Sequence, residues 1–448
     1  MVDLCFTNAR ILTEKGLIEG GLAVEDGVIV KIGAETKLGK AERTIDVGGK
    51  IIAPGLVDLH VHFREPGFTQ KEDFLTGTRA AAAGGVTTIV DEPNNSPVTN
   101  SLETIESKME IIKGKAYVDY SLQMATYGDK LDEIAKAREY GIKAFPVFDE
   151  LGDKPTGMEN TGVLREAMQK IKAVEGLALL NCRESDLVIK TMNGIKEAGR
   201  NKLSDYMAHF PHVAESLGGA KRIHLAHETG VQAHFREVST AETVEMLRSM
   251  KGYMGNITAE VRPDHLFLNI ENTEDMGPYA QQWTPLRTEA DSDALWKALN
   301  DGTVNVIASD HATHAWEEKE RGAEDIWKSP PGLPAIESML PLLLTAVNSG
   351  NLGLERLFEC ASTNPAKIMG LYPKKGPIKV GSDADLVVID LKKESVIRGE
   401  NSKAKTHWTP FEGWETQGTV EATYVRGIET YMEGEIVGTP GQGRFLSL

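Results

Sequence analysis

The sequence has few of the features that mark secreted, membrane-spanning or disulfide-rich proteins. Its 448 residues include only three cysteines, Cys5, Cys182 and Cys360, which excludes a disulfide framework or a CxxC metal cluster and favours a reducing compartment. The longest apolar runs, such as MLPLLLTAV, are too short to cross a bilayer, and the amino terminus shows no signal-peptide pattern. We therefore expect a cytoplasmic protein with no membrane partner.

Positive charge is also scarce. Lys and Arg number 49 against 66 Asp and Glu, which gives a formal net charge of −17. This balance argues against broad binding to nucleic acid or to anionic membranes. A small anionic substrate remains compatible with it, provided that the binding site supplies its own positive charge.

Both ends of the chain are typical of short strands. LAVEDGVIVKIG contains two apolar runs around Asp26-Gly27, which predicts a hairpin because glycine accepts the positive φ of a tight turn. Near the other end, VEATYVRGIETYMEGEIVG is rich in β-branched residues, and a turn is expected at Glu433-Gly434. We expect residues 1–53 and 376–448 to meet in one small β-sandwich domain.

The middle of the chain, residues 54–375, alternates strand-like and helix-like segments. Runs such as LVDLHVHF, VTTIVDEPNN, GIKAFPVF, GLALLNC and VNVIASDH are each followed by a helix-like stretch. Such repeats predict parallel strands with crossover helices, and about eight units favour a (β/α)8 TIM-type barrel over an open sheet. The predicted class is therefore α/β, a barrel with a β appendage.

His60 and His62 are the first candidate site. Residues two apart in a strand point to the same side, so both imidazoles face one spot. Imidazole pairs bind metal ions, and polar residues at the carboxyl end of a barrel strand are typical of catalytic sites. Arg64 and Glu65 follow at once, which strengthens this interpretation over that of two ordinary histidines.

VIASDHATH is the second candidate site. A strand run ends at Asp310, and His311 and His314 follow within four residues. A carboxylate beside a metal ion can hold the ion, take a proton from water and deliver it to a leaving nitrogen. The alternative is an Asp that caps the next helix, which explains a single carboxylate better than this cluster.

Lys143, in YGIKAFPVF, is the third candidate. Its apolar neighbours predict a strand, and burial lowers the pKa of a lysine, so that the neutral amine can react with carbon dioxide to form a carbamate. The alternative is a lysine whose stem is buried and whose amine reaches solvent.

Taken together, these segments resemble dihydroorotases of the amidohydrolase superfamily over nearly the whole chain. The similar segments, in order, include APGLVDLHVHFREPG, GGVTTIVDEPNN, FPHVAES, ASDHATH, STNPAKIMGL, VGSDADLVVID, TPFEGW and GRF. HVHFREPG and TPFEGW are the most specific of them. The resemblance implies interconversion of dihydroorotate and N-carbamoyl-L-aspartate, a step of pyrimidine (UMP) synthesis that usually uses zinc.

The resemblance also implies roles for single residues. Three residues match the ligands of the first metal ion: His60, His62 and Asp310. Asp310 also matches the general base that works with metal-bound hydroxide, and Lys143 matches a carbamylated ligand. Three others match groups that hold the substrate carboxylate and ring, namely Arg64, Asn94 and His314.

Several positions depart from the family pattern. Asn181 and Glu237 stand where two histidines would bind the second ion, so that site is either rebuilt with oxygen ligands, which suit harder ions than zinc, or absent. Trp283 replaces a substrate-binding Asn, and Glu92 replaces the Met of an MPN motif. His227, in AKRIHLAHETG, is expected on a helix face rather than at the metal.

Two other functions remain open. Trp283 and Glu92 change the expected substrate wall, which would suit another cyclic amidase, such as a hydantoinase or allantoinase. The loss of the second-site histidines at Asn181 and Glu237 would also suit a non-catalytic subunit that partners aspartate transcarbamoylase, or a homo-oligomer. The sequence supports dihydroorotase activity over both, because His60, His62, Arg64, Asp310 and His314 are all present.

Overall fold

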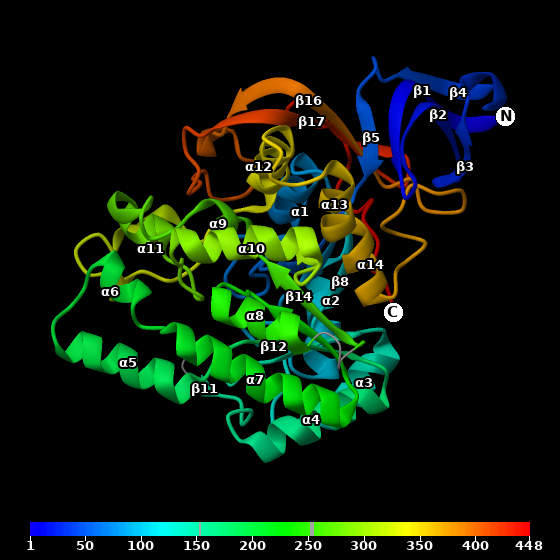
Figure 1. Ribbon diagram of the computed structural model, residues 1–448. Coiled ribbons are helices and arrows are strands. Elements are labelled where there is room, and N and C mark those ends of the chain that lie inside the picture. Colours follow the sequence, from blue (N-terminus) through cyan, green and yellow to red (C-terminus); the bar gives the residue numbers. More distant parts are fainter. Residues whose placement is uncertain (152–153, 251–254) are drawn as a thin grey trace.

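The computed structural model describes residues 1–151, 154–250 and 255–448 (Figure 1). Strands from both ends of the chain share one sheet, in the order β19-β18-β17-β16-β5-β1-β2-β3, with β4 paired to β1. Figure 1 shows the blue strands near the amino terminus beside the orange β16 and β17. The strands of this sheet are β1 (Val2–Thr13), β2 (Gly16–Glu25), β3 (Val28–Gly33), β4 (Ala41–Asp46), β5 (Ile51–Pro54), β16 (Leu386–Val396), β17 (Glu415–Val425), β18 (Ile428–Met432) and β19 (Glu435–Ile436).

The two predicted hairpin turns are confirmed. β2 and β3 pair antiparallel across Asp26 and Gly27, whose φ angles are 51° and 77°. β18 and β19 do the same across Glu433 and Gly434, with φ angles of 45° and 97°. Two successive positive φ values match the right-handed twist of the flanking strands, which is why a glycine stands in each turn.

Eight parallel strands form the centre of the molecule. One sheet has the order β6-β7-β8 and another the order β9-β12-β13-β14-β15. Bridges between Gln123 and Ala144 and between Val61 and His311 join the two sheets at both edges. The strands therefore follow one another in chain order around a closed path, called the strand ring below. Its members are β6 (Leu56–Val61), β7 (Val86–Asp91), β8 (Asp119–Leu122), β9 (Ala144–Val147), β12 (Leu177–Asn181), β13 (Gln232–Arg236), β14 (Ile257–Val261) and β15 (Val306–Ile307).

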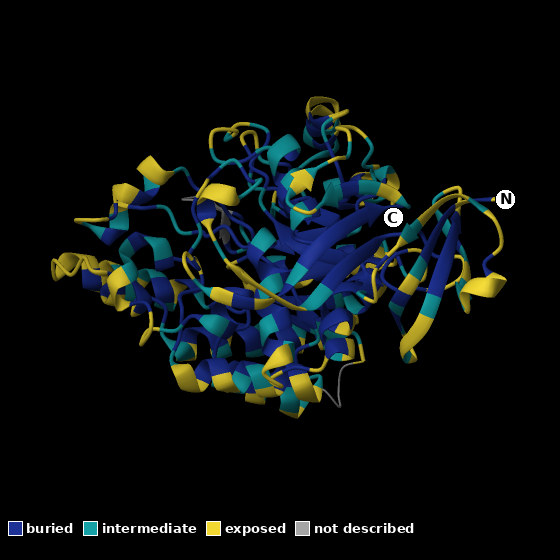
Figure 2. Ribbon diagram, turned by 90° about the horizontal axis from the view of Figure 1, so that it is seen from above, coloured by how far each residue is buried: buried dark blue, intermediate teal, exposed yellow. Residues whose placement is uncertain are grey.

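Helices follow the ring strands and cover them (Figure 1). Figure 2 shows mostly buried strands at the centre of the molecule, with exposed residues on the outer faces of the helices. A short ribbon of β10 (Glu150–Leu151) and β11 (Lys154–Pro155) follows β9. The helices are α1 (Phe74–Ala83), α2 (Leu102–Ile112), α3 (Glu133–Tyr140), α4 (Thr161–Ala173), α5 (Ser185–Glu197), α6 (Leu203–Met207), α7 (His212–Thr229), α8 (Ala241–Met250), α9 (Pro263–Phe267), α10 (Glu289–Asp301), α11 (Trp316–Glu320), α12 (Ile336–Asn348), α13 (Leu354–Phe358) and α14 (Asn364–Met369). Within the described ranges, no helix combines the length and the apolar character that a bilayer span needs.

The inside of the ring is apolar near the start of its strands and charged near their ends. Leu177 and Leu179 of β12 pack with Val306 and Ala308 on the β15 side, in a cluster that also includes residues of α14. Because side chains alternate along a strand, the next inward positions are Asn181 on β12 and, beyond β15, Asp310. The apolar cluster is therefore the floor of the ring, and the polar residues lie above it.

Candidate active site

The carboxyl ends of the ring strands bring the candidate residues together. His60 lies near the end of β6, Arg236 ends β13, Glu260 lies near the end of β14, and Asp310 follows β15. The backbone is unusual at this edge, since Arg64, Glu237 and Asp310 have φ angles of 59°, 55° and 45°. Positive φ values cost free energy in residues other than glycine, and such residues gather where surrounding contacts fix a functional side chain.

The two imidazoles and Asp310 form the centre of the site, as the spacing of the histidines predicts. The Nε2 atoms of His60 and His62 lie 3.2 and 2.9 Å from the same oxygen, Oδ1 of Asp310. On the far side of each ring, His60 Nδ1 donates to Glu260 Oε1 at 2.6 Å and His62 Nδ1 donates to Asn94 Oδ1 at 2.9 Å. These outer bonds turn both Nε2 atoms toward the carboxylate.

The charges of this cluster stabilise one another. Burial and Arg236 disfavour the charged His60 ring, but Asp310 and Glu260 outweigh them and raise the pKa of His60 to about 9. Burial alone would raise the pKa of Asp310, yet His60, His62 and Arg262 hold it well below its usual range. Asp310 is therefore a carboxylate at neutral pH.

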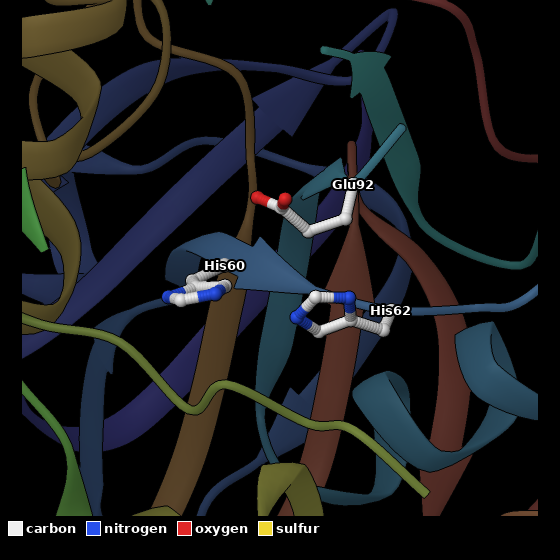
Figure 3. Close-up of side chains that lie close together, drawn as sticks. All are labelled: His60, His62 and Glu92. Carbon is white, nitrogen blue, oxygen red and sulfur yellow. The ribbon is translucent and has the colours of Figure 1, made fainter. Parts of the chain in front are cut away.

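Glu92 and Arg236 complete the inner wall. Figure 3 shows the Glu92 carboxylate turned toward the imidazole pair. Arg236 Nη2 lies 2.8 Å from Glu92 Oε1 and also contacts His60 Nε2, and its guanidinium lies 5.7 Å from the ring centre of Phe148. Apart from this ion pair, neither oxygen of Glu92 has a hydrogen-bond partner among the described residues.

A second buried guanidinium lies on the other side of Asp310. Arg262 Nη1 is 2.8 Å from Asp310 Oδ2 and 3.1 Å from Glu237 Oε2, and its other nitrogens bind Asp264. The second oxygen of Glu237 accepts from the amide of Asn181 at 2.8 Å. Asn181 and Glu237 are thus joined to each other and to a guanidinium.

A cationic pocket borders Asp310 on the side of α11. Arg64 Nη2 lies 3.4 Å from His314 Nε2, and Lys71 Nζ lies 3.1 Å from His314 Nδ1. His314 Nε2 also lies 2.9 Å from the carbonyl oxygen of Pro331, to which it donates. Burial, together with the charges of Arg64 and Lys71, lowers the pKa of His314 to about 3, so its imidazole is neutral. The pocket carries positive charge on Arg64 and on Lys71, and Glu318 of α11 pairs with Lys71 at 3.2 Å.

Comparison with known proteins identifies the family. The amidohydrolase family model matches residues 51–430, which is most of the chain. The chain belongs to the amidohydrolase family. It is 34% identical over 456 aligned positions to a dihydroorotase of Methanosarcina acetivorans, covering 100% of this chain and 96% of that protein.

Hydantoinases are similar to this amidohydrolase at nearly the same level. An L-hydantoinase of Paenarthrobacter aurescens is 31% identical over 458 aligned positions, covering 100% of this chain and 98% of that protein. The solved structure of an L-hydantoinase (dihydropyrimidinase) from Arthrobacter aurescens has a TM-score of 0.95 at 31% identity and covers 100% of both chains. Family membership and these relatives indicate an amide hydrolase.

The residues of this amidohydrolase fit one divalent cation. With both Nδ1 atoms donating outward, a cation that displaces the proton of His60 would meet two Nε2 lone pairs and one oxygen of Asp310. His60, His62 and Asp310 are a suitable donor set for such an ion. A cation there would share His60 Nε2 with Arg236, whose guanidinium would have to move away.

The prediction that Lys143 is a metal ligand is wrong. Lys143 precedes β9, at the opposite end of the strand from the His60 cluster, and its charged neighbours are Arg138 and Glu175. On β9, Ala144 belongs to the floor of the ring while Phe145 packs outward, so the inward position nearer the site is Pro146. Proline has no ligand atom, so this strand offers no lysine to form a carbamate.

The structure also places three further residues that the sequence singled out. His227, like His224, is exposed on α7, as expected for a helix face. Trp283 is 39% exposed and stacks with Arg183, whose guanidinium carbon lies 4.7 Å from the ring centre. Asn94 was expected to hold substrate, but its side-chain oxygen accepts a hydrogen bond from His62.

Sequence analysis missed the buried charges of β13 and β14. His234 and Arg236 are two residues apart on β13, and Glu260 and Arg262 are two apart at the end of β14. This is the same spacing that singled out His60 and His62. Charged residues at alternate positions of these two strands could therefore have indicated that they line the site.

Proposed function

We propose that the chain is a dihydroorotase that interconverts dihydroorotate and N-carbamoyl-L-aspartate, a reaction of pyrimidine synthesis. One observation carries the proposal: the cationic pocket of Arg64, Lys71 and His314 lies beside Asp310. Both compounds carry carboxylates, which such a pocket binds. A neutral ring would leave the buried Nε of Arg64 without a hydrogen-bond partner, at a cost in free energy.

Arg64 is well placed to bind the substrate carboxylate. Its side chain is buried, and its Nε has no hydrogen-bond partner among the described residues. A guanidinium presents two parallel N–H groups to a carboxylate, which gives orientation as well as affinity. Lys71, which pairs with Glu318, adds a second cationic group, and the neutral His314 ring lies against Arg64.

Asp310 moves the proton. A divalent cation at His60, His62 and Asp310, which we propose to be zinc, would supply Lewis-acid activation of water and of the amide carbonyl. Asp310 takes the proton from the attacking water and gives it to the ring nitrogen as the carbon–nitrogen bond breaks. One water is consumed in ring opening and released in ring closure. The low pKa of Asp310 keeps its carboxylate ionised.

The test is turnover by the purified full-length chain supplied with Zn²⁺. Dihydroorotate and dihydrouracil differ only in the carboxylate, so their comparison isolates the role of the cationic pocket. We expect dihydroorotate and carbamoyl-aspartate to interconvert, and dihydrouracil to react far more slowly. No turnover of dihydroorotate with Zn²⁺, Mn²⁺ or Mg²⁺ would refute the proposal.

Hydantoin hydrolysis is the second candidate, favoured by the TM-score of 0.95 to an L-hydantoinase. Turnover of hydantoins without turnover of dihydroorotate would establish it. If no ring is opened, the result would support a non-catalytic subunit, and copurification with aspartate transcarbamoylase would then be the next observation to seek.

The division of the chain into a barrel and a small β domain is also proposed. We propose that the strand ring and its helices form a (β/α)8 barrel over residues 54–375, and that residues 1–53 and 376–448 form a separate small β domain. The ring order and its two closing bridges support the barrel. The sheet that unites both ends of the chain supports the small domain.

A further inference from the structure

Arg236 places a buried guanidinium against one of the histidines that would hold a cation. It is 2% exposed, and its guanidinium is surrounded by three groups of the site. Nη2 contacts His60 Nε2 and lies 2.8 Å from Glu92 Oε1, and Nε lies 3.9 Å from Glu260 Oε1. A permanent positive charge thus lies against the nitrogen with which His60 could otherwise bind a cation.

Few donors are left for a second cation. Pro146 takes the inward position of β9, and the amide nitrogen of Asn181 points at Glu237, although its oxygen has no hydrogen-bond partner among the described residues. The other oxygen of Glu237 accepts from Arg262 at 3.1 Å and from Thr284 Oγ1 at 2.6 Å. Two residue groups of the site are close enough to hold an ion, His60–His62–Glu92 and His60–Glu237–Asp310, and because they share His60 they do not provide two separate sites.

Charge balance explains the two arginines. Four buried carboxylates surround the centre, those of Glu92, Glu237, Glu260 and Asp310. Buried carboxylates are costly unless positive charge compensates them. Two guanidiniums, Arg236 against Glu92 and Arg262 against Glu237 and Asp310, provide that compensation from within the chain.

We propose that the Arg236 guanidinium competes with a divalent ion for His60 Nε2, so that each chain binds one ion at most, and only when Arg236 moves aside. Glu92 is its counter-ion and holds it beside His60. Arg236 Nη1 has no hydrogen-bond partner among the described residues, which leaves its two N–H groups free for oxygens of a bound ligand. The inference does not depend on which ring the enzyme opens.

The test is a titration of chelator-treated full-length protein with Mn²⁺, followed by calorimetry and checked by elemental analysis. Mn²⁺ is chosen because it accepts both imidazole and oxygen ligands. The wild-type chain is expected to saturate at one ion. Two ions per wild-type chain would overturn the proposal without recourse to any variant.

Arg236→Gln removes the charge and keeps much of the shape. Because like charges repel across the few ångströms between the guanidinium and a bound ion, this variant is expected to bind Mn²⁺ at least tenfold more tightly, or to accept a second ion. Arg236→Lys, which keeps the charge, should behave like the wild type. Arg165→Gln, on the exposed pair with Glu228, is the control for charge removal at a distance.

Unchanged or weaker Mn²⁺ binding by a folded Arg236→Gln chain would contradict the proposal. If that variant does not fold, Glu92→Gln provides the second measurement. It removes the counter-ion and leaves Arg236 free beside His60, so Mn²⁺ binding should weaken at least tenfold. If Glu92→Gln binds Mn²⁺ as tightly as the wild type, Glu92 does not control Arg236 as proposed. No substrate enters these measurements, so they remain informative even if the chain proves not to be a dihydroorotase.

Discussion

At the scale of single residues, the outer bond of each imidazole decides what the site can bind. His62 donates from Nδ1 to Asn94, as His60 does to Glu260, and both Nε2 atoms are thereby presented to Asp310. Partners of this kind fix the tautomer and the ring orientation of a ligand histidine. They determine metal affinity although they do not touch the ion.

Asn94→Ala tests this role. Without the Asn94 oxygen the His62 ring is free to turn and to change tautomer, so affinity for Zn²⁺ is expected to fall about 10–100-fold. Competition with a chromophoric chelator measures the affinity. Asn272→Ala, in an exposed loop, is the matched control. Equal Zn²⁺ affinity in the Asn94 variant and the wild type would show that the bond to His62 has no such role.

The residues of the site could be predicted from the sequence where their spacing was regular. His60, His62 and Asp310 were found in this way, and the structure brings them together. Lys143 was assigned wrongly because a lysine amid apolar residues does not reveal which end of a strand it occupies. Arg236 and Arg262 also stand at regular spacing on their strands, but the carboxylates that neutralise them could be assigned only from the structure.

At the scale of elements, α11 and the segment that follows it cover the cationic pocket. Lys319 on α11 is fully buried and donates to the carbonyl oxygens of Pro330 at 3.0 Å and Gly332 at 3.3 Å. Burial, with a smaller effect from the charge of Lys71, lowers the pKa of Lys319 to about 7. These hydrogen bonds hold the segment next to His314, but burial of Lys319 makes its charged form costly in free energy.

That cost predicts a pH dependence. The folded pKa of Lys319, about 7, lies below the unfolded value of 10.5, so the unfolded state binds the proton more tightly. The penalty is complete below pH 7 and is relieved as the pH rises from 7 to 10.5. Relative to Lys319→Met, the wild-type free energy of unfolding should therefore increase by roughly 1–3 kcal/mol between pH 6.5 and 9.5.

Urea unfolding at the two pH values measures the difference. Lys328→Met, at a lysine whose side chain is 66% exposed in the same segment, should show no such trend. A constant difference between the wild type and Lys319→Met across this pH range would mean that Lys319 is not held in a low-pKa environment.

Some strands of the ring could be predicted from the sequence and others could not, for a physical reason. β6, β7, β9, β12 and β15 correspond to apolar runs, and these runs predicted them. β13 and β14 were not singled out, because their inward positions hold His234, Arg236 and Glu260 in place of apolar residues. Those side chains form hydrogen bonds and ion pairs with residues of other strands. The sequence of a single strand does not show which residues pair in this way.

At the scale of the whole molecule, one buried ion cluster ties the strand ring to the sheet of the two termini. Lys375 Nζ lies 2.5 Å from Asp119 on β8, 2.6 Å from Asp385, which precedes β16, and 2.9 Å from Asp383. Arg426, which follows β17, contacts the other oxygen of Asp119. The cluster therefore connects β8 to the ends of two strands of the other sheet.

Lys375→Met should destabilise the whole chain. It would leave three buried carboxylates with Arg426 as their remaining cation, and breaking a buried pair from one side costs about 3–5 kcal/mol. Thermal and urea unfolding would record the loss. Lys374→Met, at the exposed neighbour, should leave stability within about 0.5 kcal/mol of the wild type. A small effect of Lys375→Met would mean that the two parts are held together by other contacts.

The most direct test of the account is the substrate preference of Arg64→Gln. The wild type should prefer dihydroorotate to dihydrouracil, because only dihydroorotate offers a carboxylate to Arg64. In the variant, kcat/KM for dihydroorotate should fall about 10–100-fold, the equivalent of one lost charge-assisted interaction, with a far smaller change for dihydrouracil. An equal loss for both substrates, or a wild type with no preference between them, would contradict the assignment of the pocket and of the substrate.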